Sequence, residues 1–181
     1  MEDATDDTSG LKFKVLVLGD WAVGKTSLVR HFVEKKFYED YLPTLGVNIL
    51  VKDFPMEFRG EEVTVTFALW DVAGQEVFRP LLPTYHKSAS GIYFVADLTR
   101  LQSFESLELW HRDVYRTLDH PVPTILLANK CDLDYWVDES FLAESAEQIG
   151  AFSYFKTSAN TGENVAEAFE AMATRILEEM E

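Results

Sequence analysis

The strongest constraint on the fold is a phosphate-binding pattern near the N-terminus. Residues 19–26 read Gly-Asp-Trp-Ala-Val-Gly-Lys-Thr and match the pattern GxxxxGK[ST]. The apolar run 13–18, typical of a short buried strand, precedes the pattern, and a stretch with helical spacing over 25–36 follows it. Backbone N–H groups of such a loop and of the helix N-terminus form a nest for phosphate anions. The motif therefore predicts a nucleotide-binding domain and leaves the base undecided.

Single residues of this loop carry distinct parts of the chemistry. Gly24 permits close approach of a phosphate, Lys25 can reach the β- and γ-phosphates, and Thr26 can ligate Mg²⁺. We expect the whole loop and the residue after it to contact nucleotide, namely Gly19, Asp20, Trp21, Ala22, Val23, Gly24, Lys25, Thr26 and Ser27.

Strand and helix patterns alternate along the chain, which is typical of βαβ units with right-handed crossovers. The residues 58–62 have hairpin length and include a glycine, which predicts one antiparallel edge pair. We therefore expect an α/β fold with a six-stranded, mostly parallel sheet, one antiparallel edge strand and helices on both faces. The expected strands are 13–18, 47–57, 63–70, 91–97, 123–128 and 152–156. The expected helices are 25–36, 104–118, 139–149 and 165–176.

The length of 181 residues fits one domain, expected over 12–177, with a flexible acidic tail over 1–11 and a short end over 178–181. The chain has 16 Lys and Arg against 31 Asp and Glu, a net charge of −15. This balance disfavours nucleic-acid partners and anionic lipid surfaces, which both select basic proteins. The excess acid lies in 1–10, 132–150 and 163–181, where solvated surfaces explain it best.

The cysteine and histidine residues predict no separate site. The single cysteine, Cys131, excludes an intramolecular disulfide and is expected to pack rather than to act as a nucleophile. The four histidines match no metal-ligand spacing. Asp97 ends an expected strand, where a helix-capping or turn role is favoured over metal binding.

A second motif, Asn129-Lys130-Cys131-Asp132, follows the strand expected over 123–128. The Asp132 carboxylate can accept hydrogen bonds from N1–H and the exocyclic amine of guanine, and adenine offers neither donor on that edge. Lys130 can cover one face of the base. After the last expected strand, a backbone N–H of Ser158-Ala159 could meet the guanine O6. The two motifs in this order predict guanine specificity.

With these motifs the chain resembles the Ras-like small GTPases, and among them the Rab branch, over about residues 12–177. The resemblance implies a P-loop small GTPase domain, GTP and GDP as ligands and Mg²⁺ as cofactor. It is carried by the phosphate loop, 41–46 (Tyr-Leu-Pro-Thr-Leu-Gly), 70–76 (Trp-Asp-Val-Ala-Gly-Gln-Glu), 129–132 and 158–159, with 78–85 and 161–165 resembling Rab proteins in particular.

The resemblance also assigns the switch and catalytic residues. Thr44 would ligate Mg²⁺ and touch the γ-phosphate only in the GTP state, and Asp71 would hold Mg²⁺ through water. Gln75 would orient the attacking water, so Gln75, Lys25 and Thr44 form the expected catalytic set. Phosphoryl transfer needs such positioning and charge neutralisation more than covalent chemistry.

Three further nucleotide contacts follow from the same resemblance. Gly74 would give its backbone N–H to the γ-phosphate, and Tyr41 could cover the phosphates. Phe37 would lie edge-on over the guanine, although an ordinary packing role is the alternative. Thr44 and Gly74 lose their phosphate contacts on hydrolysis, which would give an order–disorder switch.

The sequence departs from the family pattern at several positions. Trp21 stands where many relatives have a small residue, so its indole could exclude a partner's arginine finger; the alternative is that it points outward and packs on the second switch. Ala22 replaces a frequent glycine with little expected effect. Asn160 replaces a frequent lysine beside the base, which predicts lower affinity. No arginine occurs near Leu42, so we expect no internal arginine finger of the heterotrimeric kind and slow, activator-dependent turnover.

The resemblance implies a GTPase-activating protein, an exchange factor and effectors as partners, for a cytoplasmic monomer. The chain ends 177–181 without a cysteine for prenylation, so membrane association is expected only through a C-terminal tail absent from this sequence. The expected effector surface comprises Leu45, Val47, Ile49, Trp70, Phe78 and Tyr85.

Two other functions stay open at this point. One is a GTP-binding adaptor that hydrolyses weakly or not at all, which Trp21 motivates and Gln75 opposes. The other is a P-loop ATPase or nucleotide kinase, which the guanine motif opposes.

Overall fold

The computed structural model describes residues 10–39 and 42–181. The expected acidic tail, apart from Gly10 and Leu11, and the expected phosphate cover Tyr41 lie outside the described residues. Leu11 is already part of the first strand, one residue before the expected start of the domain. The strands are β1 (Leu11–Leu18), β2 (Val47–Phe58), β3 (Glu61–Val72), β4 (Gly91–Asp97), β5 (Thr124–Asn129) and β6 (Ser153–Thr157). The helices are α1 (Lys25–Glu34), the 3₁₀ helix η1 (Glu76–Leu81), α2 (Leu82–His86), α3 (Gln102–Glu105), α4 (Leu107–Tyr115), α5 (Glu139–Gln148) and α6 (Val165–Glu179).

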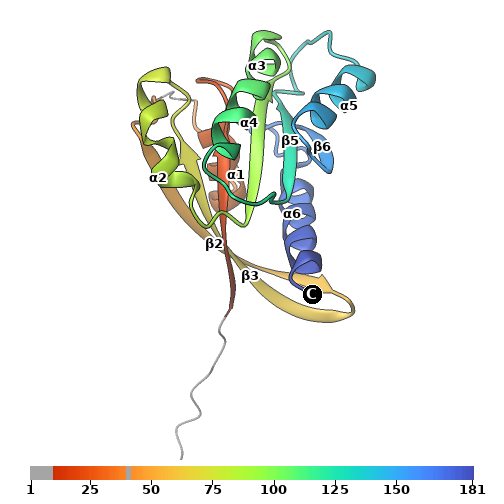
Figure 1. The fold of residues 1–181 in the computed structure, drawn as a ribbon. Helices are drawn as coiled ribbons and strands as arrows, with labels where there is room; N and C mark the ends of the chain where they lie inside the picture. The colour runs from red at the N-terminus through yellow and green to blue at the C-terminus, as the bar shows by residue number, and fades with distance from the viewer. Residues whose placement is uncertain (1–9, 40–41) are drawn as a thin grey trace, which may run out of the picture.

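One sheet holds the six strands in the order β2-β3-β1-β4-β5-β6 (Figure 1). The β2–β3 pair is antiparallel and the other neighbouring pairs are parallel, which confirms the expected fold. In the central strand, Val15 pairs with Leu69 of β3 on one side and with Gly91 of β4 on the other. The parallel strands therefore end at a shared edge, where loops of an open α/β sheet bind ligands.

Alternating side chains of β1 divide the core between the two faces of the sheet. Val15 and Val17 belong to a cluster with α1 and α6, in which the Phe32 and Phe169 rings stack at 4.0 Å. Leu16 and Leu18 belong to a second cluster, with α2, α3, α4 and α5. The sheet is thus buried on both faces, as the continuous apolar runs of β1, β4 and β5 predict.

The hairpin is tighter than the five-residue link expected over 58–62. Phe58 pairs with Glu61, so only Arg59 and Gly60 form the turn. Both turn residues have positive φ, 53° and 83°, as two-residue hairpin turns that match the strand twist require. Backbone pairing between β2 and β3 continues beyond the residues whose apolar side chains alternate. The sequence pattern therefore ended β2 one residue too early and began β3 two residues too late.

Two helical regions also differ from expectation. The helix expected over 104–118 is split into α3 and α4 at Ser106, whose hydroxyl donates to the Gln102 carbonyl at 2.9 Å; such back-bonding bends helices. The segment 76–86 forms η1 and α2, where no element was expected.

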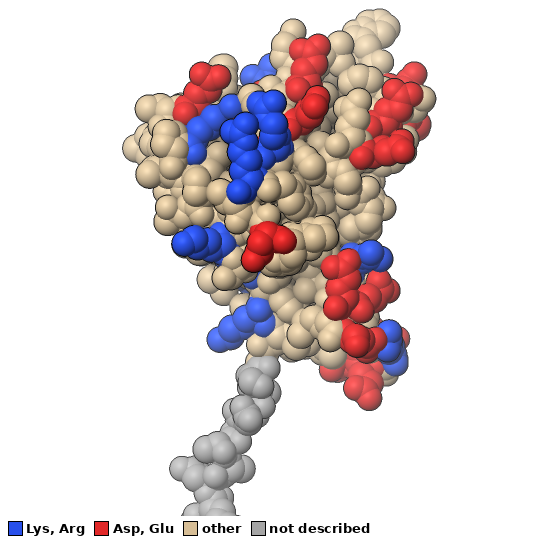
Figure 2. All heavy atoms as spheres, in the orientation of Figure 1, with Lys and Arg blue, Asp and Glu red and all other residues tan. Residues whose placement is uncertain are grey.

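Acidic side chains gather over α5 and around the C-terminal end of α6 (Figure 2), which belong to two of the segments that hold the charge excess in the sequence. In the described parts of the chain, helices are too short or too polar to cross a membrane.

Candidate functional site

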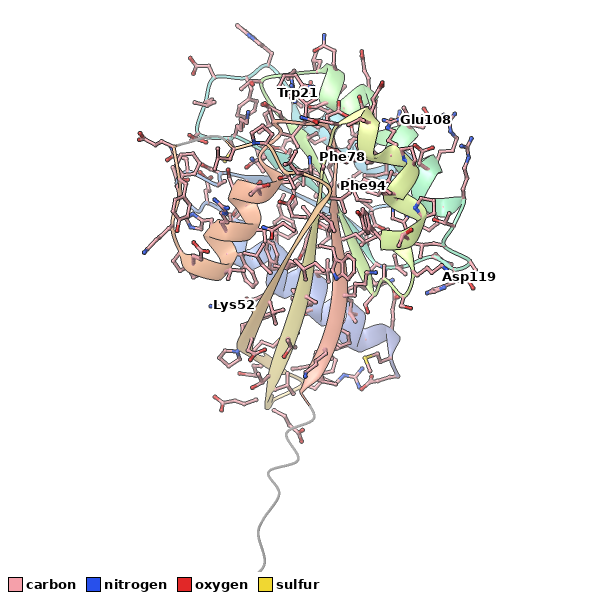
Figure 3. All side chains as sticks on the ribbon, turned by 90° about the vertical axis from the view of Figure 1, so that its left-hand side faces the viewer. Trp21, Lys52, Phe78, Phe94, Glu108 and Asp119 are labelled. Atoms are coloured by element: carbon pink, nitrogen blue, oxygen red, sulfur yellow. The ribbon has the colours of Figure 1, made fainter. Side chains whose placement is uncertain are left out.

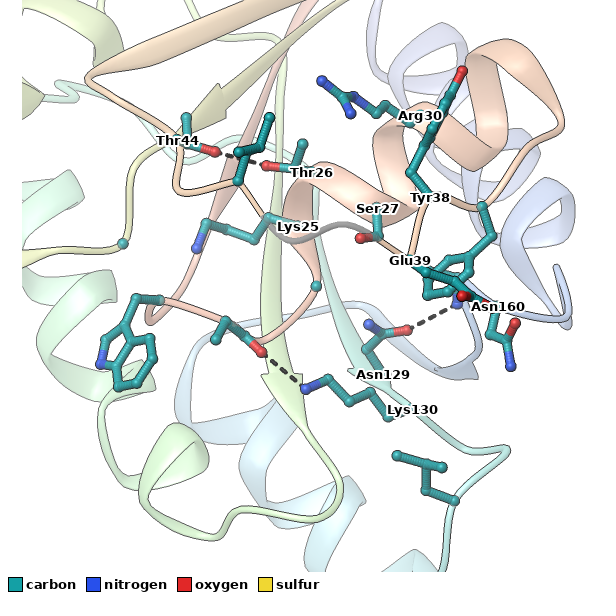
Figure 4. Close-up of a pocket in the computed structure, with 18 of the residues that line it drawn as sticks. Lys25, Thr26, Ser27, Arg30, Tyr38, Glu39, Thr44, Asn129, Lys130 and Asn160 are labelled. Atoms are coloured by element: carbon teal, nitrogen blue, oxygen red, sulfur yellow. Dashed lines mark hydrogen bonds between the residues drawn. The ribbon is translucent and has the colours of Figure 1, made fainter.

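A cavity of about 340 Å³ lies at the loop edge of the sheet (Figure 4). Its walls come from the phosphate loop, the segment before β2, the loop after β3 and the loops after β5 and β6. The expected site residues that line it are Trp21, Ala22, Gly24, Lys25, Thr26, Ser27, Phe37, Thr44, Gly74, Gln75, Asn129, Lys130, Asp132, Ala159 and Asn160. Gly19, Asp20, Val23, Asp71 and Ser158 do not line it and act through the contacts below.

Lys25 begins α1 and folds back beneath the loop that precedes it. Its Nζ donates to the Gly19 carbonyl at 2.8 Å and to the Asp20 carbonyl at 2.6 Å. Burial lowers the Lys25 pKa to about 8, against the opposing attraction of Asp71 and Asp20. Because burial disfavours this ammonium, an arriving phosphate would stabilise it more strongly than it would a solvated lysine.

Asn129 and Lys130, at the end of β5, hold the other side of the phosphate loop. Asn129 Nδ2 donates to the Val23 carbonyl at 2.9 Å. Lys130 Nζ donates to the Ala22 carbonyl at 2.9 Å, as Figure 4 shows. A Cβ on Gly24 would lie 2.2 Å from Asn129 Nδ2, so only glycine leaves room for this contact. The base motif thus also shapes the phosphate loop, a role that its sequence pattern does not disclose.

Asp97 serves the turn role that the sequence favoured. Its Oδ2 pairs with Lys130 Nζ at 2.7 Å, and its Oδ1 accepts from the backbone N–H and the hydroxyl of Thr99. Although burial opposes ionisation, the hydrogen bonds from Lys130 and Thr99 lower the Asp97 pKa. The carboxylate therefore orients Lys130.

Two hydroxyls and a carboxylate converge between α1 and β3. Thr26 Oγ1 lies 2.7 Å from Thr44 Oγ1 and donates to Asp71 Oδ2 at 2.5 Å, and the Thr44 hydroxyl reaches the same oxygen at 3.4 Å. Asp71 is fully buried, and its Oδ1 has no hydrogen-bond partner in the described ranges. Burial raises the Asp71 pKa. A buried, half-satisfied carboxylate beside two hydroxyls fits the oxygen ligands that Mg²⁺ prefers.

The corner expected to read the base is held by hydrogen bonds among the protein's own groups. Asp132 Oδ1 accepts from the Ser158 hydroxyl at 2.7 Å, and Oδ2 accepts from Asn160 Nδ2 at 3.1 Å. Although desolvation opposes it, these bonds lower the Asp132 pKa. The carboxylate is thus ionised and oriented. Asn160, for which the sequence predicted only a loss of affinity, helps to orient it.

Cys131 lies in the same motif and is half-buried. Burial raises the Cys131 pKa to about 11, with Glu163 nearby adding to the shift. Because the thiolate is the reactive form, this environment supports the expected packing role.

Gly74, Gln75 and Trp21 lie together at the end of the cavity where the γ-phosphate is expected. A Cβ on Gly74 would lie 2.4 Å from the Trp21 backbone nitrogen, so this close approach requires glycine. Trp21 lines the cavity and is 56% exposed, and Figure 3 shows it at the end of the molecule opposite the β2–β3 hairpin. Its indole stacks on Arg100 at 5.3 Å from the guanidinium carbon, a partner that neither alternative for Trp21 anticipated.

Further lining residues were missed by sequence reasoning. Arg30 and Tyr38 line the cavity, with the Arg30 guanidinium 5.3 Å from the Tyr38 ring (Figure 4), and Leu133 lines the base end. Arg30 could have been found, because it lies four residues after Thr26 on the same helix face. Phe37 is 42% exposed and lines the cavity, which favours the nucleotide over core packing.

The expected effector surface avoids the fully buried core. Leu45 and Ile49 are 78% and 47% exposed, whereas Val47, Trp70 and Tyr85 are half-buried against the second core cluster. Phe78 of η1 is also half-buried.

Comparison with known proteins agrees with this geometry. The Ras family model matches residues 14–178. The Ras-related protein Rab-7b of Bos taurus is 38% identical over 91% of this chain and 82% of its own length, and Rab-7b of Homo sapiens is 36% identical over the same shares. Rab-13 of Mesocricetus auratus is 34% identical over 91% of this chain and 80% of its own length. With this match and these contacts, the chain belongs to the Ras family of small GTPases as a Rab-like member.

Proposed function

We propose that this protein is a molecular switch that binds GTP and GDP with Mg²⁺, hydrolyses GTP slowly and recruits effectors in the GTP form. The observation that carries the proposal is that Lys25, Thr44, Gln75 and Asp132 line one shared cavity. These residues come from four separate segments, and each has the chemistry that one part of a guanine nucleotide demands.

The reaction would use positioned groups rather than a covalent intermediate. Lys25 and the N–H groups of the phosphate loop would stabilise charge on the phosphates, and the Gln75 amide would orient a water molecule for in-line attack on the γ-phosphate. Thr26, Thr44 and Asp71 would hold Mg²⁺, Asp71 through water, and the bound ion would neutralise charge on the phosphate oxygens.

Gln75 provides the direct test of hydrolysis. We expect Gln75→Ala to lower the single-turnover rate of GTP hydrolysis by at least about tenfold while GTP binding persists, because the variant loses the water-orienting amide. Gln102→Ala, on α3, is the matched control. An unchanged rate in Gln75→Ala would remove Gln75 from the mechanism, and absence of turnover in the parent protein with Mg²⁺ would favour the adaptor.

Nucleotide identity is tested separately. Chromatography of the nucleotide released from the denatured purified protein should yield GDP or GTP. Competition should favour GDP over ADP, because the Asp132 carboxylate has no donor to accept from on adenine. Preference for ADP would instead support a P-loop ATPase or nucleotide kinase.

Regulation by partners follows the family pattern. An activator, an exchange factor and effectors would contact the segments around Thr44 and Gln75, where Leu42, Leu45 and Val77 are 75%, 78% and 73% exposed. A role in membrane traffic is proposed from the similarity to Rab proteins, with a cytoplasmic location and membrane contact through a C-terminal tail.

A further inference from the structure

Each backbone carbonyl of residues 19–23 accepts a hydrogen bond from a side chain. The donors are Lys25 to Gly19 and Asp20, Arg100 to Trp21, Lys130 to Ala22, and Asn129 to Val23. Three of these donors belong to the phosphate and base motifs. Arg100 belongs to neither motif, yet it completes the set.

Arg100 approaches the loop from outside the cavity, in the turn between β4 and α3. Its Nη2 donates to the Trp21 carbonyl at 2.7 Å, and its guanidinium carbon lies 5.3 Å from the Trp21 ring centroid. The two contacts hold both the backbone and the indole of one residue at the rim of the cavity.

The backbone of Arg100 is itself fixed by the turn. Its N–H donates to the Asp97 carbonyl at 2.9 Å, and its carbonyl accepts from the Ser103 hydroxyl at 2.7 Å. The same Asp97 orients Lys130 through its carboxylate. The donors to the Trp21 and Ala22 carbonyls thus share one rigid support, at the end of β4.

Packing alone does not account for an arginine at this position. The Arg100 Nε is buried and has no hydrogen-bond partner in the part of the chain that the structure describes. An unpaired buried N–H costs free energy, which an apolar side chain would avoid. The hydrogen bond from Arg100 Nη2 to the Trp21 carbonyl offsets this cost.

We propose that Arg100 is a positioning residue for the γ-phosphate end of the nucleotide site. By drawing the Trp21 carbonyl outward, it keeps the neighbouring N–H groups turned toward the phosphates and holds the indole at the rim of the cavity that Gly74 and Gln75 also line. This inference rests on the proposed function. It predicts that Arg100 favours the triphosphate over the diphosphate and leaves the choice of base untouched.

The test compares Arg100→Ala and Arg100→Lys with Arg116→Ala, which changes an exposed arginine of the turn after α4. Affinities are measured by competition for GDP, ADP and a non-hydrolysable GTP analogue, together with the melting temperature. We expect Arg100→Ala to lower the ratio of triphosphate to diphosphate affinity by about tenfold, the loss of one charged hydrogen bond. Lysine keeps a charged donor, so Arg100→Lys should recover most of that ratio.

The outcomes separate positioning from general stability. A ratio in Arg100→Ala equal to that in Arg116→Ala would overturn the inference, as would a fall in melting temperature with an unchanged ratio. Failure of Arg100→Lys to recover the ratio would also overturn it. If the parent protein binds no guanine nucleotide, the proposed function fails instead, and the two failures are distinct.

A second arm isolates the carbonyl contact from the indole. Trp21→Gly removes the stacking partner and keeps the carbonyl, so Arg100→Ala should still lower the ratio in that background. If Arg100→Ala no longer lowers the affinity ratio in the Trp21→Gly background, the effect depends on the indole contact. That result would overturn the proposal that the hydrogen bond to the Trp21 carbonyl causes it.

Discussion

The corner expected to read the base and the end expected to hold the γ-phosphate lie in the same cavity and are built differently. At the base corner, both oxygens of Asp132 accept hydrogen bonds from protein groups, and the buried Asn129 contacts Val23, Thr157 and Ala159. At the γ-phosphate end, Asp71 keeps an oxygen without a partner among the described residues, and exposed apolar side chains flank the segments around Thr44 and Gln75.

The contrast separates recognition from response. A corner whose groups are already oriented can select a base without rearrangement, because the ordering cost has been met in folding. An end that keeps a buried carboxylate oxygen without a partner among the described residues would change its contacts when Mg²⁺ and the γ-phosphate leave. Changes at the first region should therefore alter which nucleotide binds, and changes at the second should alter how the protein responds to it.

The largest expected effect tests the base corner. Asp132→Asn should lower GDP affinity by about 1000-fold and shift preference toward xanthine nucleotides, because an amide offers a donor where guanine needs an acceptor. Competition of GDP against xanthosine diphosphate measures both changes. Asp134→Asn, in the same exposed loop, is the control. Retained guanine preference in Asp132→Asn would refute its role as base reader.

The next effect tests the γ-phosphate end. Asp71→Asn should lower the affinity for Mg²⁺ by about 10–100-fold, the usual loss when a group that orients a metal's ligands is removed. The measurement is the rate of GDP release across a Mg²⁺ titration. Asp53→Asn on β2 is the control, because the Asp53 carboxylate accepts a hydrogen bond from the Thr66 hydroxyl on the neighbouring strand. An equal Mg²⁺ dependence of GDP release in both variants would contradict the assignment of Asp71 to the Mg²⁺ site. The preference for guanine should stay unchanged in both variants.

The sequence predicted the fold well because periodicity and order along the chain determine it. The apolar runs of β1, β4 and β5 located three buried strands, and alternation located β3. The ends were less accurate: the hairpin narrows to Arg59 and Gly60, since backbone pairing needs no apolar side chain. The segment 76–86 was missed because Pro80 and Pro83 interrupt its helical pattern, although both fit within short helical turns.

The site was predicted wherever a motif encodes local chemistry, and missed where contacts join distant segments. Asn129, Lys130 and Asp132 were identified from spacing, but the contacts of Asn129 with Val23 and of Lys130 with Ala22 depend on the sheet order, in which β4 lies between β1 and β5. Arg100 shows the limit most clearly, because 79 residues separate it from the Trp21 carbonyl that it binds. No local pattern announces such a contact.

The smallest expected effect tests how the end of the segment after Gln75 is held in place. His86, at the end of α2, is fully buried, and its Nδ1 lies 2.9 Å from the Thr117 hydroxyl after α4. Burial, with Lys14 nearby, lowers the His86 pKa to about 4, against the opposing attraction of Asp113. A folded-state pKa below the unfolded value means that the unfolded chain binds the proton first, so stability falls as pH drops from about 6.5 toward 4 and no further.

We therefore expect the free energy of unfolding to fall between pH 7 and pH 4.5 by about 2 kcal/mol more in the parent protein than in His86→Gln. Urea unfolding at both pH values measures the difference, and His120→Gln, which changes an exposed histidine, should behave as the parent. Equal losses in parent and His86→Gln would mean that His86 does not anchor α2. The predicted result would instead show that His86 is held as a neutral, buried imidazole and helps to fix the end of α2 against Thr117.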